Sequence, residues 1–125
     1  MAVTELTKEN FDQTIAQHPF AIIDFWAPWC GPCQSFAPVF EAVSEKHPNI
    51  LFAKVNTEQE QELAAQFQIR SIPTLMIIRD NIIVYAQPGA LPESALEDLI
   101  RQAENLDMDE VRKQLAEQQA QQPGA

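Results

Sequence analysis

Residues 20–33 read Phe20-Ala-Ile-Ile-Asp-Phe-Trp-Ala-Pro-Trp-Cys-Gly-Pro-Cys33, a strand-like run followed by a pair of cysteines. The run over 20–26 is too short and too continuously apolar for an amphipathic helix, and it fits a β-strand covered on both faces. Cys30 and Cys33 are the only two cysteines among the 125 residues. A Cys-x-x-Cys unit directly after a strand is more readily explained as a disulfide exchange site than as a structural staple.

Strands and helices alternate along the rest of the chain. Apolar spacing and apolar runs predict helices at 33–46 and 58–67, and strands at 50–56, 73–78 and 82–87. Thr7 can cap an earlier helix that carries Phe11 and Ile15. Pro92 suits the first turn of a last helix, whose apolar stripe is expected to cover the sheet. This order of elements is typical of the α/β class.

The last two predicted strands are close enough in the chain to pair as an antiparallel hairpin. Only Arg79-Asp80-Asn81 separate them. Asp-Asn is a weaker turn signal than Asn-Gly, but Asn81 tolerates a positive φ better than most residues do. We therefore expect a tight turn at this point.

Composition narrows the classes of function. Eighteen acidic against eight basic side chains leave a formal charge of −10, which disfavours nucleic acid and anionic membrane surfaces, because phosphate binding needs clustered Lys and Arg. No apolar run approaches the ~18 residues of a membrane span, and residues 1–10 lack the pattern of a signal peptide. We expect one compact domain in the cytoplasm, where a lone cysteine pair is catalytic rather than stabilising.

The motifs taken together resemble a known family. The chain is similar to a thioredoxin in residues 24–33, which include Trp-Cys-Gly-Pro-Cys, in Lys54, in Ile72-Pro73-Thr74 and in Gly89-Ala90. The likeness runs over residues 3–104 without an obvious gap, and the full set of motifs is far more specific than a bare Cys-x-x-Cys. It implies a thioredoxin fold, with a central mixed β-sheet flanked by helices and a cis peptide bond before Pro73.

The chain continues beyond this resemblance. The next residues form a possible capping box and a narrow apolar stripe: Asp107 and Glu110, then Met108, Val111 and Leu115. We expect a thioredoxin domain over 1–105, a helical extension over 106–118 and a disordered Gln-rich tail over 119–125, which has nothing to bury. The extra helix either packs back on its own domain or binds a partner, which would suit a co-chaperone module that holds client proteins.

The positions of the two cysteines suit two different roles, an attacking thiol and a resolving thiol. Cys30 would lie at the N-terminus of the helix over 33–46, where unpaired backbone N–H groups and the helix dipole stabilise a thiolate and lower its pKa. Cys33 would face the same side of the first turn and resolve the mixed disulfide. Gly31 and Pro32 fix the turn between them, and Gly31 allows close approach by a protein substrate.

Other uses of the cysteine pair are weaker interpretations. A closed, inert disulfide is opposed by cytosolic reductants. A zinc site would need further ligands, and the distant His18 and His47 give no ligand spacing. We therefore expect no metal, and no cofactor beyond the redox-active Cys30–Cys33 disulfide.

Asp24 is a carboxylate inside an apolar strand. Burial without a counter-charge should raise its pKa, and the resemblance implies that it accepts the proton of Cys33 as that thiol attacks. Lys54 matches the lysine that approaches this aspartate in thioredoxins and modulates its ionisation. A hydrogen-bonded core aspartate and a surface lysine remain open as simpler interpretations.

The resemblance also implies where a substrate binds. With a cis bond before Pro73, the Ile72 backbone would lie beside the Cys30 sulfur and offer strand-like hydrogen bonds to an extended peptide. A shallow apolar contact surface would then be formed by Trp29, Ile72, Pro73, Gly89 and Ala90. We assign Trp26, which follows the buried strand, to the core instead.

Partners follow from the same resemblance. It implies protein disulfide substrates and an NADPH-dependent thioredoxin reductase as electron donor, and we expect a monomer. The chain departs from the family pattern at Gln34, Ser71, Asn81 and Pro88, where a basic residue, two glycines and an apolar residue are common. These departures bear on the range of partners rather than on the thiol chemistry.

Overall fold

Five strands form one mixed sheet in the order β1-β3-β2-β4-β5. The strands are β1 (Val3–Glu5), β2 (Phe20–Trp26), β3 (Leu51–Asn56), β4 (Thr74–Arg79) and β5 (Ile82–Pro88). Strands β1 and β2 both run parallel to β3, whereas the β2–β4 and β4–β5 pairs are antiparallel. The structure, a computed structural model, describes residues 3–121. The predicted mixed sheet is confirmed.

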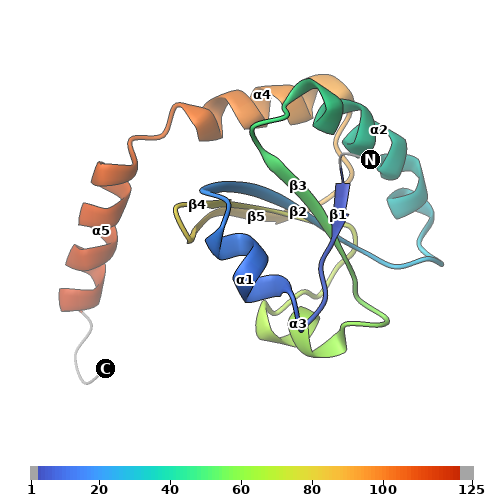
Figure 1. Cartoon of the computed structure of the whole chain (residues 1–125), viewed down its shortest axis with the longest axis horizontal. Helices are drawn as coiled ribbons and strands as arrows, with labels where there is room; N and C mark the ends of the chain where they lie inside the picture. Colours follow the sequence, from blue (N-terminus) through green and yellow to red (C-terminus); the bar gives the residue numbers. More distant parts are fainter. Residues whose placement is uncertain (1–2, 122–125) are drawn as a thin grey trace.

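Helices cover both faces of this sheet (Figure 1). They are α1 (Phe11–Ala16), α2 (Gly31–Lys46), α3 (Gln61–Gln66), α4 (Glu93–Glu104) and α5 (Met108–Gln121). Helices α1 and α3 enclose one apolar core against the sheet, and α2 and α4 enclose another on the opposite face. Helix α5 stands apart from these layers, beyond the end of α4.

Strand β2 occupies the centre of the sheet. Six of its seven residues are buried, because helices cover both of its faces. Ile23 packs in the core under α1 and α3, while Ile22 packs in the core under α2 and α4. Because both faces of the strand are covered, apolar side chains are needed on both of them, which explains the uninterrupted apolar run. The observed strand has the predicted bounds, residues 20–26.

The N-terminal region differs from its prediction. Residues 3–5 form an edge strand that was not predicted, since three residues are too short to show a period. Thr7 does not cap the first helix, and that prediction was wrong. Asn10 stands at the N-cap, and its Oδ1 accepts a hydrogen bond from the Thr7 backbone N–H at 2.7 Å. Pro92 is likewise the N-cap of α4, one residue before the helix begins.

The hairpin between β4 and β5 is confirmed. Asp80 and Asn81 connect the strands with φ values of 51° and 66°. Both residues therefore occupy the left-handed region, as a two-residue turn with the twist of the flanking strands requires. Asn and Asp tolerate this conformation better than most side chains do.

Helix α5 packs against the tip of this hairpin. Asp107 caps it by accepting hydrogen bonds from the backbone N–H groups of Asp109 and Glu110, at 3.1 and 3.2 Å. Met108 is buried, and Arg112 forms an ion pair with Asp80 at 3.0 Å. The extension thus returns to its own domain, as one of the two interpretations expected.

The helix also runs further than predicted. It continues to Gln121, so residues 119–121 are helical rather than disordered. Alanine and glutamine are good helix formers, which allows the helix to continue without burying an apolar face. The rest of the expected tail, residues 122–125, lies outside the described part of the chain.

Candidate active site

Cys30 and Cys33 form a disulfide at the N-terminus of α2, with their Cα atoms 5.2 Å apart. Helix α2 starts at Gly31, two residues before its predicted start at Cys33, so Cys30 is its N-cap residue. The Cys33 backbone N–H donates to Cys30 Sγ at 3.2 Å. This first-turn donor and the helix dipole stabilise negative charge on the Cys30 sulfur when the disulfide is open.

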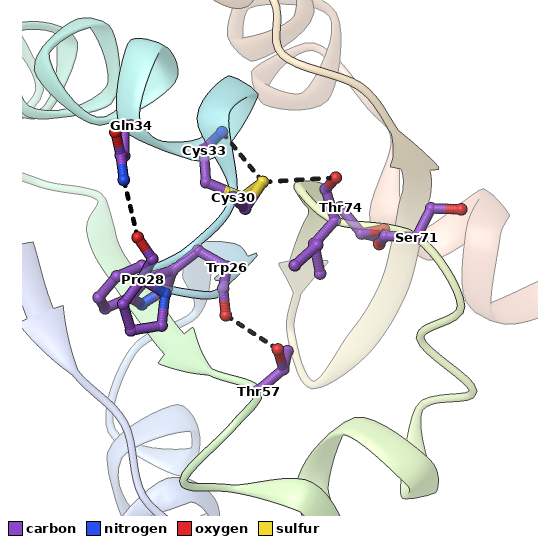
Figure 2. Close-up of a disulfide and its surroundings, with 9 residues drawn as sticks. Trp26, Pro28, Cys30, Cys33, Gln34, Thr57, Ser71 and Thr74 are labelled. Carbon is purple, nitrogen blue, oxygen red and sulfur yellow. Dashed lines mark hydrogen bonds between the residues drawn. A yellow bond between two sulfur atoms is a disulfide. The ribbon is translucent and has the colours of Figure 1, made fainter.

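The loop between β2 and α2 exposes the residues around the disulfide, although Cys30 and Cys33 themselves are only 5% and 2% exposed. Trp29 is 67% exposed, and Gly31 has open space where a Cβ atom would stand. Gln34 donates from Nε2 to the Pro28 carbonyl oxygen at 2.7 Å, which ties the helix to the loop (Figure 2). The neutral side chain at position 34 thus supplies a hydrogen bond to the loop.

A second loop faces the disulfide from the start of β4 (Figure 2). The Ile72–Pro73 peptide bond is cis, as the resemblance implied. The Ile72 carbonyl oxygen lies 3.8 Å from Cys30 Sγ, and the Ile72 side chain packs against the cysteines. Thr74 Oγ1 donates to the Ser71 carbonyl oxygen at 2.5 Å, which closes the loop around Pro73.

The end of β5 approaches the same loop. The Gly89 backbone N–H donates to the Pro73 carbonyl oxygen at 2.9 Å. Gly89 has a φ of +130°, which favours glycine, and Ala90 follows it as an exposed residue. The structure therefore brings Ile72, Pro73 and Gly89 together, with Ile72 beside Cys30.

Asp24 lies on the face of β2 that α2 covers. It is only 3% exposed, and its Oδ1 atom has no hydrogen-bond partner among the described residues. Burial raises the pKa of Asp24 from 3.8 to about 7, although the positive charge of Lys54 acts in the opposite direction. A carboxyl group with this pKa can hold or release a proton near neutral pH.

Lys54 is the partner of Asp24 in the register between β2 and β3. Its ammonium does not reach the carboxylate. Lys54 Nζ instead lies 4.9 Å from the centroid of the Trp26 ring, a cation–π contact, and the side chain is half-buried. The lysine is thus neither a free surface residue nor the direct ion partner of Asp24.

Trp26 differs from its assignment to the core. The side chain is half-exposed and packs against the small cluster formed by Ala27, Cys30 and Cys33. Its Nε1 atom is buried without an acceptor in the described region. Trp26 therefore connects the surroundings of the disulfide to the Lys54 ammonium, a role that its position after an apolar run did not reveal.

Two carboxylates near Asp24 were also missed by the sequence analysis. Glu5 and Glu41 line the same pocket of about 270 Å³ as Asp24 and Lys54. In the sequence, Glu41 cannot be distinguished from other exposed glutamates of the helix, and Glu5 belongs to the strand β1, which was not predicted. Only the register between β1 and β3, which aligns Glu5 with Lys54, could have indicated this arrangement.

A cysteine pair at a helix N-terminus, opposed by a cis-proline loop on a mixed sheet, defines a thiol–disulfide oxidoreductase. The family model for thioredoxin matches residues 2–102. The chain therefore belongs to the thioredoxin family.

Individual relatives agree with this assignment. A protein named "Putative thioredoxin 2" from Streptomyces coelicolor is 62% identical over 120 residues, covering 96% of this chain and 90% of that protein. Thioredoxin from Haemophilus influenzae is 37% identical over 102 residues, covering 80% of this chain and 95% of its own length. The Streptomyces match extends into residues 106–125, which the family model does not reach.

Solved structures share the fold. A mutant thioredoxin from Halobacterium salinarum superimposes with a TM-score of 0.77 at 31% identity, covering 83% of this chain and 92% of the other. Plasmodium falciparum thioredoxin gives 0.74 at 34% identity, covering 79% and 97%.

The family and the cysteine pair together establish the reaction. The chain is a thiol–disulfide oxidoreductase that performs dithiol–disulfide exchange through Cys30 and Cys33, as predicted, and the client-holding alternative is not favoured. Within residues 3–121, no group of His, Cys, Asp and Glu side chains is arranged to hold a metal ion. In the same residues, no helix combines the length and apolar character needed to cross a membrane.

Proposed function

We propose that this thioredoxin reduces disulfides of protein substrates, with Cys30 as the attacking thiol and Cys33 as the resolving thiol. The position of Cys30 carries the proposal: it is the N-cap of α2, its sulfur accepts a backbone N–H, and it adjoins the Ile72 carbonyl. A thiolate there is stabilised, and the exposed neighbours Trp29 and Gly31 mark the side from which a substrate disulfide approaches it.

The exchange takes two steps. The Cys30 thiolate attacks one sulfur of the substrate disulfide, so that a mixed disulfide forms and one substrate thiolate leaves. The Cys33 thiol then gives its proton to the Asp24 carboxylate and attacks Cys30 Sγ. The Cys30–Cys33 bond forms, the mixed disulfide breaks, and the second substrate thiolate leaves.

The proton acceptor in this scheme is Asp24. Its burial, its unpartnered Oδ1 and its pKa of about 7 support this role, since an ordinary aspartate would hold a proton too weakly. Lys54 modulates the ionisation of Asp24 by its charge. A carboxyl group kept in the core only for packing would have a hydrogen-bond partner for each buried oxygen.

A substrate peptide lies in extended form against the loop before β4. The exposed Trp29 and the grouped Ile72, Pro73 and Gly89 support this placement, with Ala90 at its edge. Gly31 has no side chain and has open space around it, which leaves room beside Cys30 for a protein substrate.

The oxidised protein is returned to the dithiol by an NADPH-dependent thioredoxin reductase in the cytoplasm. A reducing compartment suits an exchange site of this kind, which needs no group beyond its own disulfide. The departures at Gln34 and Ser71 lie in the first turn of α2 and in the cis-proline loop, so they bear on recognition by the reductase rather than on the thiol chemistry (Figure 2).

Reduction of insulin disulfides by dithiothreitol tests the catalytic proposal. We expect strong turnover by the native protein at neutral pH and its loss in Cys30→Ser at equal concentration. Turnover that survives in Cys30→Ser would remove Cys30 as the nucleophile. NADPH oxidation in the presence of a thioredoxin reductase and insulin tests the electron donor separately, because dithiothreitol bypasses that step.

A further inference from the structure

A pocket of about 270 Å³ connects the buried Asp24 carboxyl to the edge of the sheet. It lies between helix α2 and the strands β1 and β3, and its polar lining consists of Glu5, Asp24, Glu41 and Lys54. The pocket is far larger than the space for one water molecule, which is roughly 10–15 Å³ of probe volume. Asp24 lines this pocket, while its Oδ1 atom is buried without a partner in the described protein.

Three of the charged residues form one row across the sheet. Glu5 is aligned with Lys54 in the β1–β3 register, and Lys54 is aligned with Asp24 in the β2–β3 register. Neighbouring strands are about 4.8 Å apart, so the lysine stands between two carboxyl groups on adjacent strands. β1 is the edge strand, which leaves Glu5 exposed while Asp24 is buried.

Helix α2 adds a fourth charge. Glu41 lines the pocket from above the sheet and is exposed. On the other side of Asp24, the register partner on β4 is the apolar Leu75. The charged groups that face Asp24 are thus Lys54 from β3, Glu5 from β1 and Glu41 from α2.

The position of Lys54 indicates a balance between these groups. Its Nζ atom lies over the Trp26 ring, and among residues 3–120 the side chain forms no ion pair. Asp24 therefore has no bound counter-ion among these residues, although Lys54 stands between it and Glu5 in the strand registers.

We propose that Glu5 and Glu41 are positioning residues of the exchange reaction, which compete with Asp24 for the Lys54 ammonium and so set how strongly that lysine stabilises the Asp24 carboxylate. The inference rests on the proposed role of Asp24 as proton acceptor. The two glutamates keep the carboxyl group basic enough to take the proton of Cys33, and the pocket lets that proton leave to water afterwards.

The direction of the effect follows from the charges. Neutralising Glu5 or Glu41 removes a competitor for Lys54 and a negative charge near Asp24. Both changes favour the ionised carboxyl group, so the pKa of Asp24 falls below its native value of about 7. If the glutamates act on Asp24 through Lys54, their effect disappears when a neutral residue replaces the lysine. If they act on Asp24 directly by their charge, the effect remains.

The experiment follows the Asp24 carboxyl by ¹³C NMR during a pH titration of the oxidised protein. Glu5→Gln, Glu41→Gln and the double variant are compared with Glu9→Gln and Glu45→Gln, matched charge removals from residues that do not line the pocket. We expect the pocket variants to lower the pKa of Asp24 by roughly half to one unit. The controls should leave it within about a tenth of a unit of the native value, because exposed charges outside the pocket are screened.

The Lys54→Met background separates positioning from direct charge. We expect Glu5→Gln to shift the Asp24 titration by less than half as much in that background as in the native one. An equal shift in both backgrounds, or no shift in the double variant of the native protein, would overturn the proposal. Insulin turnover by Asp24→Asn tests the proton-acceptor role by itself: normal turnover would remove that role, while the titrations would still decide whether the glutamates act through Lys54.

Discussion

Lys54 and Asp24 stand directly opposite each other on neighbouring strands, yet the lysine ammonium lies over the Trp26 ring, 4.9 Å from its centroid. A buried carboxyl group is thereby left on the central strand without a bound counter-ion. This relationship explains why the pKa of Asp24 remains near 7 although a cation is close by.

The stability of the protein should depend on the ionisation of Asp24. Its pKa is raised in the folded state, so between pH 3.8 and about 7 the folded state binds more protons than the unfolded state. The contribution of this group to stability is therefore greatest at low pH and falls as pH rises through this window. Above pH 7, ionised Asp24 costs the folded state at most roughly 4 kcal/mol.

Asp24→Asn should remove this dependence. Urea unfolding at pH 8 should show the variant to be more stable than the native protein by about 1–4 kcal/mol, with the difference shrinking towards pH 4. Lys54→Met serves as the opposite control. Loss of the cation should make ionised Asp24 more destabilising, so this variant should be less stable than the native protein at pH 8. A difference between Asp24→Asn and native protein that is constant with pH would contradict the assignment.

Cys33→Ser should arrest the reaction after its first step. Cys30 still attacks the substrate, but no thiol remains to resolve the mixed disulfide. We expect a covalent complex with disulfide-containing substrate proteins on non-reducing gels, dissociated by dithiothreitol. Cys30→Ser should form no such complex, because only the Cys30 sulfur stands at the N-cap, accepts a backbone N–H and adjoins the Ile72 carbonyl. Equal trapping by the two variants would mean that either thiol can attack.

Gly89 should resist substitution more than Gly31 does. A Cβ atom at Gly89 meets no neighbour within 4 Å, but its φ of +130° is strained for any other residue. Gly89→Ala should therefore lower the free energy of unfolding by about 1–2 kcal/mol. It should also raise KM for insulin, because Gly89 bonds to Pro73 beside the proposed peptide site.

Gly31→Ala is the matched control for that strain. Gly31 also has open space around its Cα atom, and its φ is not in the positive region. Its unfolding free energy should change by less than about 0.5 kcal/mol. Equal destabilisation of the two variants would show that the backbone of Gly89 is not the cause.

Deletion of residues 106–125 should leave the exchange chemistry intact. The extension contacts the tip of the β4–β5 hairpin through Arg112 and Asp80, whereas the disulfide lies at the start of α2. Turnover of a small disulfide substrate should remain within about twofold of the native rate. Stability should fall by about 1–2 kcal/mol, since Met108 is buried.

Met108→Ala in the full chain is the companion variant. It should reproduce most of the stability loss without removing the helix. A large fall in turnover after deletion, with normal turnover in Met108→Ala, would instead assign a catalytic role to the extension.

Short stretches of the sequence were sufficient to predict the strand and the helix on either side of the cysteine pair. A window of a few residues was enough to predict three features: the buried strand β2, the exchange site at Cys-x-x-Cys and the tight turn before β5. Buried strands and tight turns depend on such neighbouring side chains, so their positions were predicted closely. The unusual position of a carboxylate in β2 was also visible, because burial of Asp24 follows from the residues beside it.

Relationships between distant segments were decided by the tertiary structure. The pocket above Asp24 unites Glu5, Glu41 and Lys54 from three separate elements, and no spacing along the chain connects them. The contact of Lys54 with Trp26 depends on the register between β2 and β3. The sequence determines which side chains are charged. Their electrostatic effect on one another depends on distance and burial, which only the packing of the strands and helices establishes.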